Sequence, residues 1–263
     1  MNTYDKIIEI WRKWNVRTES DIDLRLHNFR ILFAFNSGKI ENEAVEFHDT
    51  REIFENGQVL NFSGNPRAIF ETQNQRLCYE FLRPIIAKRE PLSIELIKTV
   101  HEILTSGTYD ERRYITKGER PGEFKKHDYV TGIAEVGSAP EDVENDLKEL
   151  INELAEMNFG ESDALSILKA AAYFHAKFEY IHPFADGNGR VGRTLLNYFL
   201  MINNHPSLIV YNEDKREYYN ALAKYDATEE ITDMLDFLIN QTVKTWEKSL
   251  ERELKREGSD GAR

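Results

Sequence analysis

Apolar residues recur at intervals of three and four over most of the chain, which is the period of an amphipathic helix. The clearest two such segments flank residues 182–193. In the first segment, which Ser162 can cap, the apolar positions are Ile167, Ala171, Phe174, Phe178 and Ile181. In the second, which begins near Asn188 or Gly189, they are Leu195, Leu196, Phe199 and Leu200. We predict two helices joined by a short loop.

The same spacing predicts further helices on both sides of this pair. They are expected at about 5–16, 21–35, 70–86, 91–107, 140–154, 216–225 and 232–256. The third is expected to end near Pro84, because proline interrupts a helix. Residues 120–139 differ, since Pro121-Gly122 indicates a turn and the β-branched and aromatic residues that follow favour a short hairpin. The pattern predicts a mostly α-helical protein with one small β-hairpin.

The loop at 182–193, His-Pro-Phe-Ala-Asp-Gly-Asn-Gly-Arg-Val-Gly-Arg, has the composition of a phosphate-binding segment. Pro183 disfavours helical geometry in the residue before it, so the first helix stops and the imidazole of His182 lies at the mouth of a turn. The amides of a first helical turn attract anions, and glycine lets a phosphate approach the backbone. Gly187 and Gly189 suit that purpose.

Charged side chains in the same loop refine this interpretation. Arg190 and Arg193 lie three residues apart, so we expect both guanidiniums to project toward one ligand. Asp186 is a hard oxygen donor, and Mg²⁺ is usually held by one or two carboxylates plus the substrate's phosphates. His182 can take a proton from an incoming hydroxyl near neutral pH. The loop predicts a catalytic site for a magnesium nucleotide; the alternative is a glycine-rich connector with a structural histidine.

Composition limits the classes of binding partner and the cellular location that we expect. The 263 residues are 41% hydrophobic, which is enough for a sizeable core. Lysine and arginine total 34 against 46 aspartates and glutamates, and the net charge of −12 argues against general binding to nucleic acid or anionic lipid. The single cysteine, Cys78, excludes an intramolecular disulfide and gives no zinc spacing. Residues 1–14 lack a continuous apolar stretch, so we expect no signal peptide, no membrane span and a cytoplasmic location.

The stretch from His182 to Arg193 resembles, at every specified position, the active-site signature of the Fic family, His-Pro-Phe-x-Asp/Glu-Gly-Asn-Gly-Arg-x-x-Arg. The resemblance implies a Fic-type helical bundle that transfers AMP from ATP to a hydroxyl side chain of a protein. It implies that His182 is the general base and Asp186 the Mg²⁺ ligand. The phosphate-binding residues would be Gly187, Asn188, Gly189, Arg190 and Arg193. A related subgroup that phosphorylates carries Ala-Asn-Lys where this chain has Gly-Asn-Gly, so Gly189 favours nucleotidyl transfer.

Residues 37–42 resemble a second motif of the family, the self-inhibitory Ser/Thr-x-x-x-Glu-Gly/Asn, through Ser37, Glu41 and Asn42. The motif lies N-terminal to the core, where one subclass of the family has it. If Glu41 pairs with Arg193, that arginine cannot hold the γ-phosphate, and ATP binds in a pose unsuited to in-line attack. The alternative is that Glu41 is a solvated surface carboxylate.

The family also has a β-hairpin flap that holds the target segment by strand addition over the active site. We assign the flap to about residues 126–137, with a packed edge hairpin as the alternative. The residues expected to bind the target are Tyr129, Val130, Thr131 and Gly132. An adjacent tyrosine pair often borders the nucleoside, which would place the adenine near Tyr218 and Tyr219 unless the pair only packs. Asp226 occurs near the position where the family tends to have an asparagine.

Three parts of the chain are expected. Residues 1–90 would form a helical extension with the inhibitory motif, 91–225 the Fic core with flap and signature loop, and 226–263 a C-terminal helix and tail. The partners would be ATP with Mg²⁺ and a protein with an exposed Ser, Thr or Tyr, including the chain itself, and a homodimer is left open. Two alternatives remain: a deAMPylase in which Glu41 orients water, and a non-catalytic ATP-sensing interaction module in which Glu41 never releases.

Overall fold

The centre of the protein is a pair of helices that the computed structural model places side by side. The structure describes residues 2–59, 65–130, 137–157 and 163–260. Helix α7 (Ala164–Ile181) is capped by Asp163, whose side chain accepts a hydrogen bond from the amide of Ser166. It packs along α8 (Asn188–Ile202), and the apolar side chains between the two are fully buried. The two helices predicted around the loop are thus both present.

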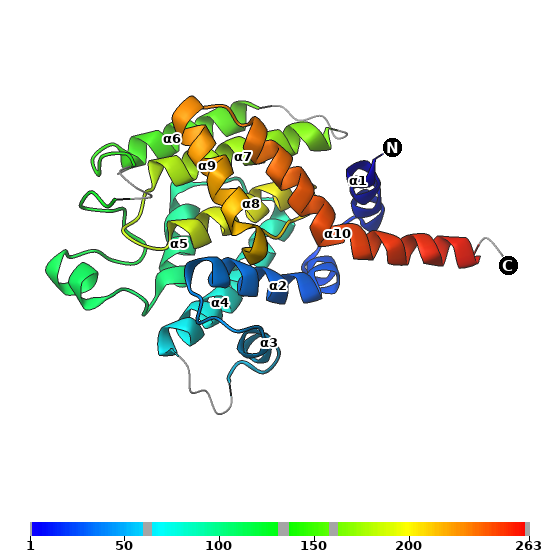
Figure 1. The fold of residues 1–263 in the computed structure, drawn as a ribbon, viewed down its shortest axis with the longest axis horizontal. Helices are drawn as coiled ribbons and strands as arrows, with labels where there is room; N and C mark the ends of the chain where they lie inside the picture. The colour runs from blue at the N-terminus through cyan, green and yellow to red at the C-terminus, as the bar shows by residue number, and fades with distance from the viewer. Residues whose placement is uncertain (1, 60–64, 131–136, 158–162, 261–263) are drawn as a thin grey trace.

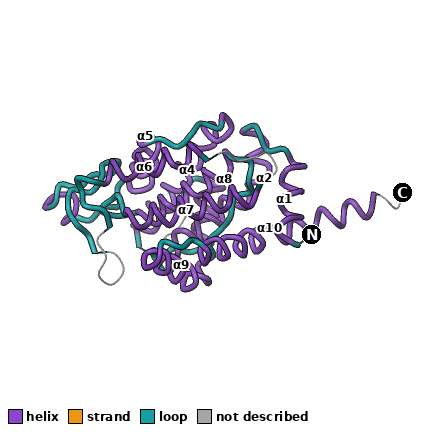
Figure 2. Tube along the Cα trace, turned by 90° about the horizontal axis from the view of Figure 1, so that it is seen from above, coloured by secondary structure: helices purple, strands orange, loops and turns teal. Residues whose placement is uncertain are grey.

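Other helices enclose this pair (Figure 1). They are α5 (Ile94–Thr105), α6 (Val143–Glu156), α9 (Lys215–Thr228) and α10 (Thr232–Asp260). Helices α6, α9 and α10 contact α7, while α5 contacts α8. The end of α10 projects beyond the rest of the molecule (Figures 1 and 2). In the described ranges, no helix is long and apolar enough to cross a membrane.

The N-terminal extension packs directly against the core. It consists of α1 (Thr3–Trp14), α2 (Glu19–Glu41), α3 (Phe47–Asn56) and α4 (Pro66–Lys88). Helix α1 lies against α10, where the rings of Trp11 and Trp246 meet edge to face at 5.4 Å. Helices α2 and α4 pair with each other, and both reach α8. The end of α2 is thereby held beside the start of α8.

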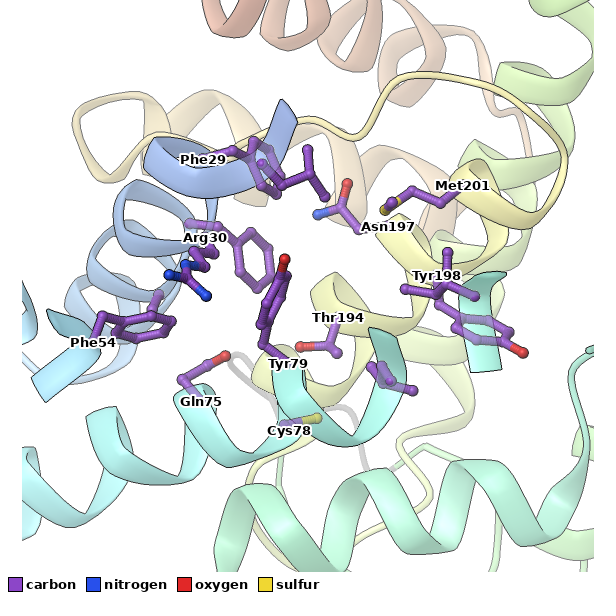
Figure 3. Close-up of a pocket in the computed structure, with 15 residues that line it drawn as sticks. Phe29, Arg30, Phe54, Gln75, Cys78, Tyr79, Thr194, Asn197, Tyr198 and Met201 are labelled. Carbon is purple, nitrogen blue, oxygen red and sulfur yellow. The ribbon is translucent and has the colours of Figure 1, made fainter. Parts of the chain in front are cut away.

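A small apolar pocket lies where α2 and α4 meet α8 (Figure 3). Its volume is about 60 Å³, and Phe29, Tyr79 and Met201 are among the residues that line it. A space of this size holds a few water molecules at most. The pocket is therefore a packing gap under the extension and too small for a nucleotide.

Two boundaries of the extension were predicted wrongly. Helix α2 does not end at Phe35 but continues to Glu41, so the expected inhibitory motif is helical except for Asn42, which follows the helix as its C-cap. Gly38, a weak helix former, lies inside this helix, and a Cβ there would be 3.4 Å from the side chain of Val45. Helix α4 passes through Pro84 to Lys88, because its packing on α2 and α5 outweighs the proline penalty. Helix α3 was not predicted.

The mostly helical fold is confirmed, and its expected hairpin can be checked only in part. In the described residues 120–130 and 137–139 there is no strand, as Figure 2 shows in its colouring. Residues 131–136, which include Thr131 and Gly132, lie outside the described residues. A short π-helical segment, η1 (Arg112–Thr116), precedes this region.

Replacing Pro84 by alanine should stabilise the protein. Proline in a helix interior lacks the amide that would donate to the preceding turn, and Pro84 lies inside α4. We expect the free energy of unfolding to rise by about 1 kcal/mol, which is less than the full propensity difference because alanine also loosens the unfolded chain. Urea denaturation followed by circular dichroism measures this change. A lower free energy would show that the ring itself contributes essential packing.

Candidate active site

The histidine of the loop is fixed by the way α7 ends. His182 has left-handed backbone geometry (φ 51°), and its amide closes the helix by donating to the carbonyl of Phe178 at 3.0 Å. Phe184 then turns into the core and stacks on His101 with ring centroids 3.7 Å apart. The side chain of Asn188 bonds both backbone groups of Phe184, at 2.9 and 2.7 Å. These contacts hold the loop in one conformation.

The expected role of Asn188 in phosphate binding stays a prediction. Its side-chain oxygen and nitrogen are both engaged with the loop backbone. What Asn188 offers a ligand is its backbone amide at the first residue of α8.

Two glycines allow a ligand to reach the start of α8. Gly187 has a φ of +84°, and a Cβ there would lie 2.5 Å from Thr105 Cγ2, so another residue would be strained. A Cβ at Gly189 would overlap the Glu41 carboxylate and lie 2.8 Å from Arg193 Nη1. Neither glycine adds a side chain over the first amides of α8, which lie at a helix N-terminus that favours anions, but the Glu41 carboxylate lies against Gly189 in the approach to them.

A cavity of about 500 Å³ lies above this helix start, a volume within the usual range for small-molecule sites. Its lining combines the loop with the end of α2, the start of α4, Arg113 and two residues of the expected flap. Of the residues predicted from sequence, those that line it are Glu41, Asn42, Tyr129, Val130, His182, Asp186, Gly187, Asn188, Gly189 and Arg190. The structure thus brings together at one cavity segments that are far apart in the chain.

The two signature arginines pair with different carboxylates, and their shared role at one ligand stays a prediction. Arg190 lines the cavity and pairs with Glu71, Nη1 to Oε1 at 3.2 Å. Arg193 is 1% exposed and does not line the cavity as it stands. One helical turn separates them, and each guanidinium is drawn toward a different carboxylate of the extension.

Residues of the expected inhibitory motif hold Arg193 in place. Its Nη2 donates to Glu41 Oε1 at 2.8 Å and to the carbonyl of Ser37 at 3.0 Å, while its Nε donates to Ser37 Oγ at 3.1 Å. Glu179 also lies near, but burial raises its pKa to about 8, so it is mostly protonated at neutral pH. Glu41, whose side chain is 36% exposed, carries the opposing charge.

Asp186 is surrounded by arginines. Its Oδ2 accepts from Arg67 Nη2 at 3.0 Å and lies 3.9 Å from Arg113 Nη1, while its Oδ1 accepts from the amide of Gly187 at 2.8 Å. Over the described ranges no group of three or more His, Cys, Asp or Glu could hold a metal. A single carboxylate beside an anion-binding helix start does fit Mg²⁺ that arrives with phosphates. Asp186 is thus suited to a metal bound with its nucleotide.

The electrostatic setting of His182 favours its neutral form. Burial lowers the pKa of His182 to about 4, and the charge of Lys125 acts in the same direction. Lys125 is itself buried, and its amide donates to the carbonyl of Pro183 at 2.9 Å. A neutral imidazole at the edge of the cavity can accept a proton from a hydroxyl group.

Glu119 anchors the first residues of the expected flap. It is buried and accepts hydrogen bonds from the hydroxyl of Tyr129 at 2.9 Å and the amide of Lys126 at 3.1 Å. This fixes Tyr129 and Val130 on the rim of the cavity. Val130 is highly exposed there.

The tyrosine pair is split between core and surface. Tyr218 is buried, with its hydroxyl 2.9 Å from His175 Nε2 and its ring 5.9 Å from the Arg193 guanidinium. Tyr219 is about half exposed, and neither ring lines the cavity. Tyr218 therefore matches the packing alternative, and the adenine position stays a prediction.

Sequence reasoning missed several contributors. His101 was interpreted as a core or interhelical histidine, and it is buried, but its Nδ1 accepts from the amide of Gly122 and its Nε2 lies 3.0 Å from the carbonyl of Asp186. It therefore supports the loop. Arg67, Glu71 and Arg113 were not considered, because no local motif marks them and only the packing of α4 and η1 brings them to the cavity.

Fold and site together define a class of protein: a helical bundle whose central helices flank an anion-binding loop with a histidine, closed from one side by a glutamate of an N-terminal helix. A sequence model of the Fic/DOC family matches residues 91–200. Residues 91–200 of this chain are therefore a Fic domain.

Relatives agree with this assignment. The chain is 38% identical over 194 residues to a protein adenylyltransferase Fic from Nematostella vectensis, covering 72% of this chain and 41% of that protein. It is 29% identical over 195 residues to protein adenylyltransferase fic-1 from Caenorhabditis briggsae, covering 73% and 36%. The chain thus spans less than half the length of these relatives.

Solved structures show the same fold. A Fic domain containing signaling protein from Bacteroides thetaiotaomicron superposes with a TM-score of 0.77 at 18% identity, covering 95% of this chain and 96% of that one. Fic-1 (residues 134–508) from C. elegans superposes with a TM-score of 0.74 at 22% identity, covering 98% and 72%. The likeness extends over the N-terminal helices as well as the Fic domain.

The imidazole of His182 should titrate far below the ordinary range. We expect an apparent pKa of about 4 in the ligand-free protein, because burial and Lys125 disfavour the imidazolium. Since the folded-state pKa lies below the unfolded value of about 6.5, the unfolded chain binds the proton first and stability falls as pH drops from 6.5 toward 4. NMR of the ring, assigned with His182→Gln, measures the pKa. Titration near 6.5 would contradict this electrostatic picture.

Proposed function

We propose that this protein transfers AMP from Mg-ATP to the hydroxyl of a Ser, Thr or Tyr side chain of a target protein, and of itself, releasing pyrophosphate. The observation that carries the proposal is the placement of His182, Asp186 and the free amides of α8 around one cavity. The printed names of the relatives, protein adenylyltransferases, support the same reaction.

The proposed chemistry is one in-line displacement. The target hydroxyl oxygen attacks the α-phosphorus, its proton passes to His182, and the bond from the α-phosphorus to the β-bridging oxygen breaks. The amides at the start of α8 and the guanidinium of Arg190 offset charge that builds on the phosphates. Mg²⁺, bound by Asp186, would supply further charge neutralisation. No covalent intermediate with the enzyme is needed.

Glu41 acts in this proposal as a brake on the same site. The charge of Arg193 is satisfied by Glu41 and Ser37, so it is not free to bind the γ-phosphate. The Glu41 carboxylate also lies over Gly189, in the approach to the helix start. Without the contact between Arg193 and the γ-phosphate, ATP does not bind with its α-phosphorus in line with the attacking hydroxyl.

The target is expected to bind beside Tyr129 and Val130, which lie on the cavity rim. Strand addition to the flap would hold a target segment mainly through its backbone, with little demand on its sequence. Such recognition leaves the target's identity open and suits an enzyme that also labels itself.

The reverse reaction is a second candidate because Glu41 lines the same cavity as His182. A carboxylate there could orient a water that removes AMP from a modified protein. Comparing AMP release from a modified target by the parent and by Glu41→Gly separates the reactions, because only the reverse reaction requires the carboxylate. An ATP-sensing module would instead bind ATP tightly and form no product even after Glu41→Gly.

Removing the brake should activate self-labelling. We expect Glu41→Gly to raise incorporation from α-labelled ATP by roughly tenfold or more, since Arg193 becomes free for the γ-phosphate. Autoradiography or intact-mass measurement detects the added AMP. An unchanged level in Glu41→Gly would refute the brake.

His182→Ala in the Glu41→Gly background provides the matched control. It should still bind nucleotide but transfer nothing, because binding does not use the imidazole and proton removal does. Transfer that persists in this double variant would remove His182 as the base.

A further inference from the structure

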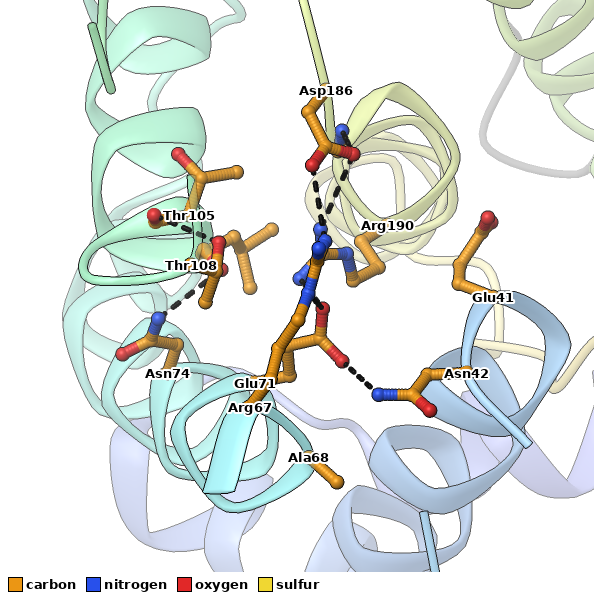
Figure 4. A network of polar contacts seen from close by, with 12 residues as sticks. Glu41, Asn42, Arg67, Ala68, Glu71, Asn74, Thr105, Thr108, Asp186 and Arg190 are labelled. Carbon is orange, nitrogen blue, oxygen red and sulfur yellow. Dashed lines mark hydrogen bonds and ion pairs between the residues drawn. The ribbon is translucent and has the colours of Figure 1, made fainter. Parts of the chain in front are cut away.

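Asp186 is already bound to a cation from the N-terminal extension. Arg67 lies in the first turn of α4, and its Nη2 donates to Asp186 Oδ2 at 3.0 Å. Its Nε donates to Glu71 Oε1, one helical turn further, at 2.8 Å. Figure 4 shows the guanidinium of Arg67 spanning the gap between these carboxylates. The arginine therefore bridges the extension and the signature loop.

The bridge is held at both its backbone and its side chain. Asn65 caps α4 by accepting from the amide of Arg67 at 2.9 Å, which fixes where the side chain starts. Glu71 is buried and also pairs with Arg190 at 3.2 Å. Its second oxygen accepts from the side-chain amide of Asn42 at 2.9 Å. A single buried carboxylate thus orients Arg67 and touches the last residue of the inhibitory motif.

A divalent cation and this guanidinium compete for the same oxygen atom. An ionised carboxylate oxygen that accepts from a guanidinium cannot also coordinate a metal at close range without bringing two positive charges together. Asp186 Oδ1 accepts from the amide of Gly187 and lies 3.9 Å from Arg190 Nη2, while Oδ2 is the oxygen that Arg67 and Arg113 face. The Arg67 side chain is 39% exposed, which leaves it room to swing away.

We propose that Arg67 is a placeholder for the divalent cation on Asp186, and that metal binding requires its displacement. This rests on the proposed function, in which Asp186 binds the metal of Mg-ATP. Arg67 then sets the affinity of the site for metal-bound nucleotide relative to metal-free nucleotide. Through Glu71 and Asn42 the placeholder is linked to the segment that carries Glu41.

The test compares binding of α,β-methylene ATP, which resists cleavage at the α-phosphorus, in Mg²⁺ and in EDTA by calorimetry. The quantity of interest is the ratio of the two affinities. We expect Arg67→Gln to raise the magnesium preference roughly threefold to tenfold, because the metal no longer displaces an ion pair. Asp186→Ala should abolish the preference, and the double variant should match Asp186→Ala.

Arg83→Gln is the matched control. Arg83 lies on the same helix and pairs with Glu19 and Asp23, away from the cavity. Its replacement should leave the magnesium preference unchanged. If thermal unfolding shows that Arg67→Gln does not fold, Arg67→Lys replaces it. The lysine ammonium cannot donate to both carboxylates with the geometry of the guanidinium, so Arg67→Lys should also raise the magnesium preference.

The outcomes separate the two proposals. An unchanged or lower preference in both Arg67 variants overturns the placeholder role, and a lower one identifies Arg67 as a phosphate ligand instead. If Asp186→Ala retains the full magnesium preference, the metal assignment in the proposed function fails. A raised preference in Arg83→Gln as well as in Arg67→Gln would show a general effect of charge and would also overturn the placeholder.

Discussion

The buried guanidinium of Arg193 is the constraint on which the rest of the structure depends. A charge that is only 1% exposed needs a close partner and satisfied donors, and here both come from one turn of α2. Ser37 and Glu41 are more than 150 residues away in sequence. The pairing therefore requires the N-terminal extension to dock on the Fic domain. The contact that docks the extension is thus also the one that we propose regulates the site.

Around that contact the loop is rigid for reasons that are mostly local. Pro183 and Gly187 set its two ends, while Phe184 anchors it in the core against His101. The packing that shapes the loop also removes water from His182 and lowers its pKa. One consequence is an imidazole that is neutral before any substrate binds.

Much of this could be predicted from sequence, because the strongest signals are short-range. The apolar spacing of α7 and α8, the stop before Pro183 and the glycines at 187 and 189 were all visible in one stretch. The extension of α2 to Glu41 and of α4 beyond Pro84 could not be predicted from sequence, because in both places tertiary packing outweighs local helix propensity.

The polar network around Asp186 was also beyond local reasoning. Arg67 and Glu71 belong to no motif, and they reach the signature loop only because α4 packs across α2, α5 and α8. The same holds for the separation of Arg190 from Arg193: their spacing was read correctly, but the carboxylates that draw them apart come from distant helices.

The central claim is that Glu41 keeps Arg193 from the γ-phosphate, and the most direct measurement is the affinity for ATP relative to ADP. It is made in the His182→Ala background with and without Glu41→Gln. The account predicts nearly equal affinities while Glu41 is present and roughly tenfold tighter ATP binding, relative to ADP, once its charge is removed. The same ATP-to-ADP ratio in both proteins would contradict it.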